Sequence, residues 1–165
     1  MIRILDKQEA EVYQKLRLEA LRANPEAFGS TYEAEVGYTP QELRQRIAPE
    51  AGKFTLGAFV EGRLAGVATF VRQNGPKTRH KGNLYGMYVS AGFRGRGIGR
   101  VLLEELIREA RKLEGLEQIT LAVVQDNEQA KALYTTAGFT VFGAEKNALK
   151  IKGEYYHEEW MVYFL

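Results

Sequence analysis

The 165-residue sequence contains no cysteine and only two histidines, His80 and His157. Without cysteine there is no disulfide framework, no thiolate zinc site and no cysteine nucleophile, and two histidines argue against a histidine-rich metal site. No apolar run approaches the length of a membrane-spanning helix. The net charge of +2 is close to neutral, whereas a dedicated nucleic-acid-binding domain is normally far more basic.

The opening residues 1–6 lack the pattern of a secretory signal peptide and predict a strand instead. The cytoplasm is therefore the expected location. The length and the ordinary apolar content suit one domain with a substantial core. No internal repeat or low-complexity linker divides the chain, so a single domain over residues 1–165 is predicted.

The spacing of apolar residues predicts an α/β (α+β) fold, a mixed sheet of about six to seven strands covered by about four helices. The expected strands are 2–6, 54–60, 64–72, 82–89, 118–124, 139–145 and 155–164. The expected helices are 9–23, 41–47, 97–113 and 127–137. Caps are expected at Thr39 and Asp126, with Gly138 ending the last helix. Strand 82–89, helix 97–113 and strand 118–124 should form a parallel βαβ unit.

The stretch from Val89 to Arg100 joins the strand to the helix of this unit and is rich in glycine and arginine. A helix start offers N–H groups without intrahelical partners and a partial positive charge. Glycines there let a ligand approach the backbone closely, and arginines match phosphate well. The residues concerned are Arg94, Gly95, Arg96, Gly97, Gly99 and Arg100. The pattern predicts a diphosphate-binding site at a helix N-terminus.

Two common phosphate-binding motifs do not match. A Walker loop needs Gly-Lys-Ser/Thr, which is absent, and a Rossmann fingerprint needs a third glycine where Arg100 stands. Residues 94–99 instead follow Arg-x-x-Gly-x-Gly, which is similar to the acyl-CoA signature of the GCN5-related N-acetyltransferases (GNAT family). A second stretch, 127–139, also resembles that family, with Asn127, Ala130, Leu133-Tyr134 and Gly138-Phe139 at the family spacing.

The resemblance covers residues 57–142, while the N-terminal third matches only in its plan. It implies a single GNAT-like domain with a twisted mixed sheet. Within that domain, acceptor-side elements would occupy about 1–52, the acyl-CoA-binding core about 54–142 and the C-terminal strands about 139–165. It also implies an acetyl-CoA-dependent N-acetyltransferase, without a metal, in which a primary amine attacks the acetyl group directly. The acceptor would be a small molecule, a protein N-terminus or a lysine.

The resemblance further implies roles for particular residues. The strand Met87-Tyr88-Val89 would bind the pantetheine arm through its backbone, and one of its N–H groups would stabilise the acetyl oxygen. Tyr134 would donate a proton to the departing CoA thiolate, since a phenol with an ordinary pKa of about 10 stays protonated at neutral pH. The expected cofactor-binding residues are Met87, Tyr88, Val89, Arg94, Gly95, Arg96, Gly97, Ile98, Gly99, Arg100, Asn127, Ala130 and Tyr134.

The general base stays unassigned at this stage. Many relatives have a glutamate on the strand before the turn, but residues 84–88 of this chain contain no carboxylate. Glu33 and Glu35 are weak candidates, His157 and Glu159 are further ones, and a water chain is equally admissible. The acceptor is also open between a polyamine, an amino acid or analogue, an aminoglycoside-like drug and a protein amino terminus.

Two other functional classes compete. The missing strand glutamate is compatible with a non-catalytic acyl-CoA-binding regulator on the same fold. The arginines of the turn are compatible with nucleic-acid binding, although the near-neutral charge argues against it. We expect neither a nucleic-acid nor a membrane partner, and the resemblance allows a homodimer through the C-terminal strand.

Overall fold

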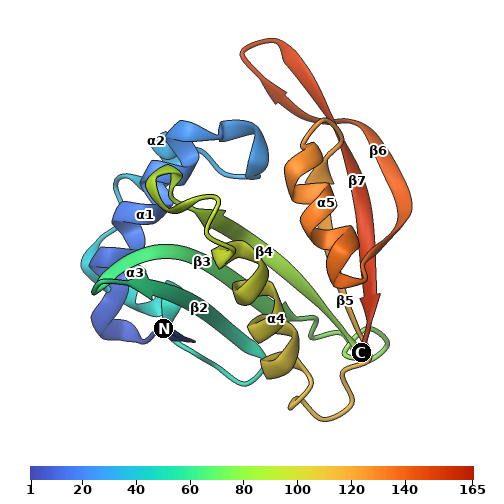
Figure 1. Ribbon diagram of the computed structural model, residues 1–165, viewed down its shortest axis with the longest axis horizontal. Helices are drawn as coiled ribbons and strands as arrows, with labels where there is room; N and C mark the ends of the chain where they lie inside the picture. The colour runs from blue at the N-terminus through green and yellow to red at the C-terminus, as the bar shows by residue number, and fades with distance from the viewer.

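The computed structural model describes residues 1–165, which form one seven-stranded sheet in the order β1-β2-β3-β4-β5-β7-β6 (Figure 1). The strands are β1 (Ile2–Ile4), β2 (Lys53–Val60), β3 (Arg63–Arg72), β4 (Lys81–Val89), β5 (Gln118–Val124), β6 (Thr140–Ile151) and β7 (Glu154–Phe164). The α-helices are α1 (Ala10–Ala23), α2 (Tyr32–Glu35), α3 (Pro40–Ile47), α4 (Ile98–Ala110) and α5 (Glu128–Ala137). Single 3-10 turns cover Lys7–Glu9, Pro25–Ala27 and Ala91–Phe93. The predicted α/β fold with a mixed sheet is confirmed.

Three details differ from the sequence prediction. The extra helix, α2, spans only four residues and begins where the Thr31 hydroxyl accepts a hydrogen bond from the Ala34 N–H, so it is too short to show periodicity. The cap of α5 is Asn127 rather than Asp126, because the Asn127 side chain accepts from the Ala130 N–H. Strand β6 continues to Ile151, beyond the expected end at residue 145.

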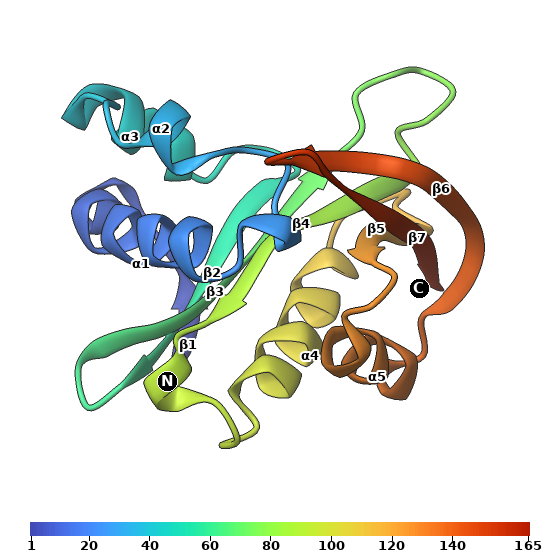
Figure 2. The same cartoon turned by 90° about the horizontal axis from the view of Figure 1, so that it is seen from above.

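The helices cover the two faces of the sheet. Figure 2 shows α1, α2 and α3 on one side and α4 and α5 on the other. Helix α4 buries Leu102, Leu103 and Leu106 against the sheet, as its helical apolar spacing predicts. Helix α1 buries Leu16 and Ala20 in a second core on the opposite face. No helix combines the length and the apolar character needed to cross a membrane.

Strand β4 opens the middle of the sheet. It pairs in parallel with β5 only through residues 81–83 and 118–120, and beyond these residues the two strands separate (Figure 1). Its pairing with β3 is also interrupted, because Thr69 faces Tyr85 but Val67 faces Tyr88. Gly86 lies in this bulge with φ +57, a left-handed conformation that glycine adopts without strain. The far half of β4 therefore has a free edge toward β5.

Candidate active site

The turn between β4 and α4 exposes its backbone to solvent. Gly95 and Gly97 have φ of +75 and +74, and Gly97 is the N-cap of α4. A Cβ placed on either glycine would meet no atom within 4 Å. Gly99 differs, since a Cβ there would lie 3.4 Å from Leu133 of α5. The first two glycines therefore leave open space in front of the N–H groups of the first helical turn, and the third allows close packing of α4 on α5.

A cavity of about 690 Å³ lies in front of this turn, between β4, α4 and α5. The predicted cofactor-binding residues line it, with the single exception of Arg96. The free edge of β4 borders the same cavity, through Met87, Tyr88 and Val89. A helix N-terminus and an unpaired strand edge in one cavity can bind a molecule with both phosphate and amide groups.

The three arginines of the turn have different environments. Arg94 donates from Nε to the Val89 carbonyl and from Nη2 to the Asn24 side chain, both at 3.0 Å. Arg100 lines the cavity and pairs with Glu104 at 2.8 Å. Arg96 lies over the ring of Phe93 and outside the cavity lining. Arg94 thus fastens the turn to the end of α1, and Arg100 is the arginine that remains next to the helix N-terminus.

Tyr134 of α5 stands where this cavity ends. Its side chain is 8% exposed and its hydroxyl lies 3.7 Å from the sulfur of Met87, across the opening between α5 and β4. Burial raises the pKa of Tyr134 to about 12. The phenol consequently remains a proton donor over the whole physiological pH range.

A second cavity of about 480 Å³ lies on the α1 face of the sheet. The two cavities meet at a shared wall formed by Ala27, Phe28, Met87, Asn127, Ala130 and Tyr134. Asn127 caps α5 with its side-chain oxygen and borders both cavities. Tyr134 lines both cavities, so its side chain borders the place where they meet.

The residues considered as the general base do not lie together at the place where the cavities meet. Glu33 is exposed, and neither cavity includes it. Glu35 is fully buried under the second cavity, where its carboxylate accepts hydrogen bonds from Arg17 and Arg46. His157 accepts a hydrogen bond at Nδ1 from the backbone of Asn147. These placements bring none of the three to the junction as a free base.

Glu159 and its neighbour Glu158 face opposite sides of β7. Glu159 pairs with Lys131 of α5 at 3.1 Å, while Glu158 and Trp160 line the second cavity. Burial, and then the nearby charge of Glu145, raises the pKa of Glu158 above its ordinary value. The sequence did not single out Glu158, because the facing of a strand residue depends on the pairing of β7 with β5, where Glu158 lies opposite Val124.

Hydrogen bonds and an ion pair to Arg17 and the charge of Arg46 decide the ionisation of Glu35. Burial alone would raise the pKa of Glu35, but the two arginines outweigh it and hold that pKa below its ordinary value. Glu35 is therefore a permanent anion at neutral pH and fixes the two guanidinium groups.

No group of three or more histidine, aspartate or glutamate side chains is arranged to hold a metal ion.

Comparison with known proteins gives a consistent result. Residues 13–139 match the model of the acetyltransferase (GNAT) family. The chain is 26% identical over 159 residues to the L-amino acid N-acetyltransferase AaaT of Escherichia coli (strain K12), covering 96% of this chain and 95% of that protein. The fold is also similar to known structures. An acetyltransferase of the GNAT family from Streptococcus pneumoniae superposes with a TM-score of 0.88 at 24% identity, covering 100% of this chain and 99% of that one.

A putative acetyltransferase from Salmonella typhimurium, solved with its cofactor acetyl-CoA, superposes with a TM-score of 0.83 at 23% identity. The match covers 100% of this chain and 93% of that one. At this level of identity the two structural likenesses establish the fold, while the family match rests on the sequence.

Proposed function

The chain belongs to the acetyltransferase (GNAT) family, and from that membership we propose that it is an acetyl-CoA-dependent N-acetyltransferase acting on a primary amine. The observation that carries the proposal is the junction of two cavities at Tyr134. One cavity has the features of a nucleotide-pantetheine site, and the other is open to an acceptor. A regulator that only binds acyl-CoA needs no second cavity meeting the first at a proton donor.

The residues that line the first cavity fit the diphosphate and pantetheine groups of acetyl-CoA. The open backbone at Gly95 and Gly97 and the N–H groups at the start of α4 would hold the diphosphate, with Arg100 beside them. The free edge of β4 would pair with the pantetheine amides as an added strand does. Arg96, which lies outside the lining, is not part of this site in our proposal.

Acetyl-CoA supplies the acetyl group: the amine nitrogen bonds to the carbonyl carbon, the carbon–sulfur bond breaks, and the products are an amide and the CoA thiol. Tyr134 donates the proton that the thiolate takes up, for which its raised pKa keeps it protonated. A backbone N–H of β4 next to the bulge stabilises the negative charge on the carbonyl oxygen.

Glu158 is our candidate for the group that removes the amine proton, directly or through one water molecule. It lines the acceptor cavity, it carries no ion pair to a cation, and its raised pKa lies closer to neutrality than that of an ordinary glutamate. Such a carboxylate accepts a proton more readily than one paired with arginine, as Glu35 is.

The acceptor is proposed to be a small molecule that fits the second cavity of about 480 Å³. The name of the Escherichia coli relative, an L-amino acid N-acetyltransferase, supports a small amine of this kind. Location in the cytoplasm stays a prediction.

Calorimetric titration with acetyl-CoA tests the donor site, with ATP and NAD as control ligands. Gly97→Glu places charge and bulk in the diphosphate site and should abolish binding of acetyl-CoA. Gly62→Glu is the matched control, since Gly62 has a similar φ of +76, lies outside both cavities, and a Cβ there meets no atom within 4 Å. Normal binding by the Gly97 variant would show that the diphosphate site is elsewhere.

Turnover is measured as release of free CoA, using a thiol reagent. Because the chain contains no cysteine, every thiol detected belongs to the product. Tight binding of acetyl-CoA with no thiol release from any amine would contradict the enzymatic function and favour an acyl-CoA-binding regulator.

A further inference from the structure

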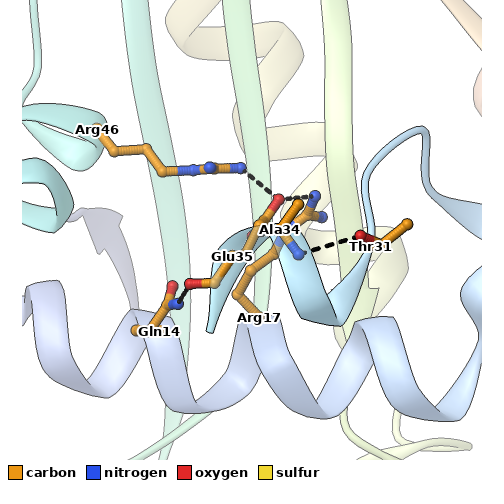
Figure 3. A network of polar contacts seen from close by, with 6 residues as sticks. All are labelled: Gln14, Arg17, Thr31, Ala34, Glu35 and Arg46. Carbon is orange, nitrogen blue, oxygen red and sulfur yellow. Dashed lines mark hydrogen bonds and ion pairs between the residues drawn. The ribbon is translucent and has the colours of Figure 1, made fainter. Parts of the chain in front are cut away.

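Two arginines and one glutamate form a cluster beneath the acceptor cavity. Nε and Nη2 of Arg17 each donate at 2.9 Å to a different oxygen of Glu35, and Nη2 of Arg46 donates at 3.0 Å to one of them. Figure 3 shows Arg46 and Arg17 reaching the Glu35 carboxylate, with Gln14 donating to the Glu35 main-chain carbonyl at 2.7 Å. One anion therefore holds two cations that both line the cavity.

The pairing leaves part of Arg17 without a partner. Its Nη1 makes no hydrogen bond in the protein, although Arg17 is a buried residue whose other two guanidinium nitrogens are engaged. The guanidinium also lies over the ring of Phe28, 4.8 Å from its centroid, which fixes its plane. Arg17 thus presents a rigid pair of N–H donors to the cavity.

The position of Nη1 connects it with the reacting groups. Nη1 lies 3.6 Å from the place that a Cβ on Gly86 would occupy, so it sits at the bulge of β4. The next residue, Met87, contacts the Tyr134 hydroxyl at 3.7 Å. Arg17 and Gly86 line the second cavity and Met87 lines both, so the cation borders the acceptor side of the strand at which the two cavities meet.

We propose that the acceptor is an α-amino acid, or a close analogue, whose carboxylate is bound by Nη1 of Arg17 with Arg46 as the second cation. This inference rests on the proposed function. In an α-amino acid a single carbon separates the amine from the carboxylate, so a cation at the bulge can bind the carboxylate while the amine reaches the junction. The free N–H groups of Nη1 can donate a charge-assisted hydrogen bond to a carboxylate oxygen.

The remaining walls agree with this acceptor. Tyr85, Leu149 and Trp160 provide apolar surface for a hydrophobic side chain. A polyamine has no carboxylate for Arg17. The two cations and one anion of the cluster leave a net charge of +1, which disfavours a polycation. The cluster therefore favours an amino acid among the acceptors that the sequence left open.

Matched acceptors test the inference on the unaltered enzyme. The standard L-amino acids other than cysteine, whose own thiol would react with the reagent, are assayed for CoA release. Hydrophobic ones are paired with their own carboxamides, and spermidine and tyramine serve as amines without a carboxylate. Hydrogen bonds to a charged group contribute about 1.5–3 kcal/mol, so kcat/KM for each acid should exceed that for its amide about 10- to 100-fold. The amide has the less basic amine, so the chemistry alone would favour the amide.

Binding gives a second readout that does not depend on turnover. Calorimetry on protein saturated with CoA should show the acid binding at least about tenfold tighter than its amide. Amides that bind and react as well as the acids, or turnover confined to amines without a carboxylate, would overturn the acceptor class and leave the acetyltransferase function intact. Absence of CoA release with every amine would overturn the function itself.

Substitutions of the two arginines test whether the preference for the acid over the amide comes from this cluster. Arg46→Gln and Arg17→Lys should each lower the ratio of kcat/KM for acid over amide about tenfold, and Arg17→Lys keeps a cation opposite Glu35 so that the fold is retained. Arg44→Gln is the control, because Arg44 lies on α3 but outside the cavity. The ratio is insensitive to a loss of folded protein, which lowers both rates equally. An unchanged ratio in both variants would overturn the assignment.

Discussion

Replacing Glu35 with glutamine should destabilise the protein strongly, although the change removes one charge and almost no volume. Glu35 is 0% exposed and accepts three hydrogen bonds from two guanidinium groups. In the variant the amide nitrogen cannot accept a hydrogen bond, and Arg17, with a side chain 9% exposed, loses its counter-ion. Removal of one partner from a buried ion pair costs about 3–5 kcal/mol.

We expect the lower end of that range, about 3 kcal/mol, because the Arg46 side chain is 32% exposed and solvent can screen its charge. Urea unfolding measures the loss. With an m value of about 2–3 kcal/mol per molar, the midpoint should fall by about 1 M. Glu33→Gln is the matched control, since Glu33 is exposed on the same helix and its replacement should change stability by less than about 0.5 kcal/mol.

The pH dependence provides an independent check. The pKa of Glu35 is lowered in the folded protein, so its contribution is present above the pKa of the unfolded chain and is lost as pH falls through the folded-state pKa. The difference between wild type and Glu35→Gln should therefore be constant near neutral pH and shrink below about pH 4. A stability difference near that of the Glu33 control, or one that grows in acid, would refute the role of the cluster.

The proposed chemistry makes two further predictions. Tyr134→Phe should lower kcat about a hundredfold while the acetyl-CoA dissociation constant stays within about twofold, because the phenol serves the leaving group; an unchanged kcat would remove Tyr134 from the reaction. Glu158→Gln should lower kcat/KM near neutral pH about a hundredfold and abolish the rise of activity as pH increases through the raised pKa of Glu158. Glu159→Gln, on the other side of β7, is the control, and a wild-type pH profile in Glu158→Gln would leave proton removal to water.

The residues that line the first cavity could be predicted because their signals are local. The turn and the first residues of α4 lie within a dozen positions of the sequence, and the helical spacing of α5 places Asn127, Ala130 and Tyr134 by itself. The hydrogen bonds of Arg94 could not be predicted from the turn alone. Its guanidinium reaches Asn24, seventy residues away, which no pattern within the turn indicates.

The charged residues in and beneath the second cavity could not be predicted, because their positions depend on contacts between residues far apart in the sequence. Glu35 resembles a solvated charge in sequence, and its burial results from a four-residue helix packed beneath two arginines that lie 18 and 11 positions away. Glu158 and Glu159 are adjacent in sequence, and only the register of β7 against β5 decides which of them faces the second cavity. These residues obtain their environment from tertiary contacts rather than from propensity.

The opening between β4 and β5 also determines how the reactants can come and go. In the proposed reaction the sheet separates donor from acceptor, and the two approach this opening from opposite sides and meet at Tyr134. Neither reactant needs to pass through the space of the other, so neither product has to leave before the second substrate arrives. Steady-state kinetics should accordingly be sequential, with intersecting double-reciprocal lines, and parallel lines would point to a covalent acetyl-enzyme.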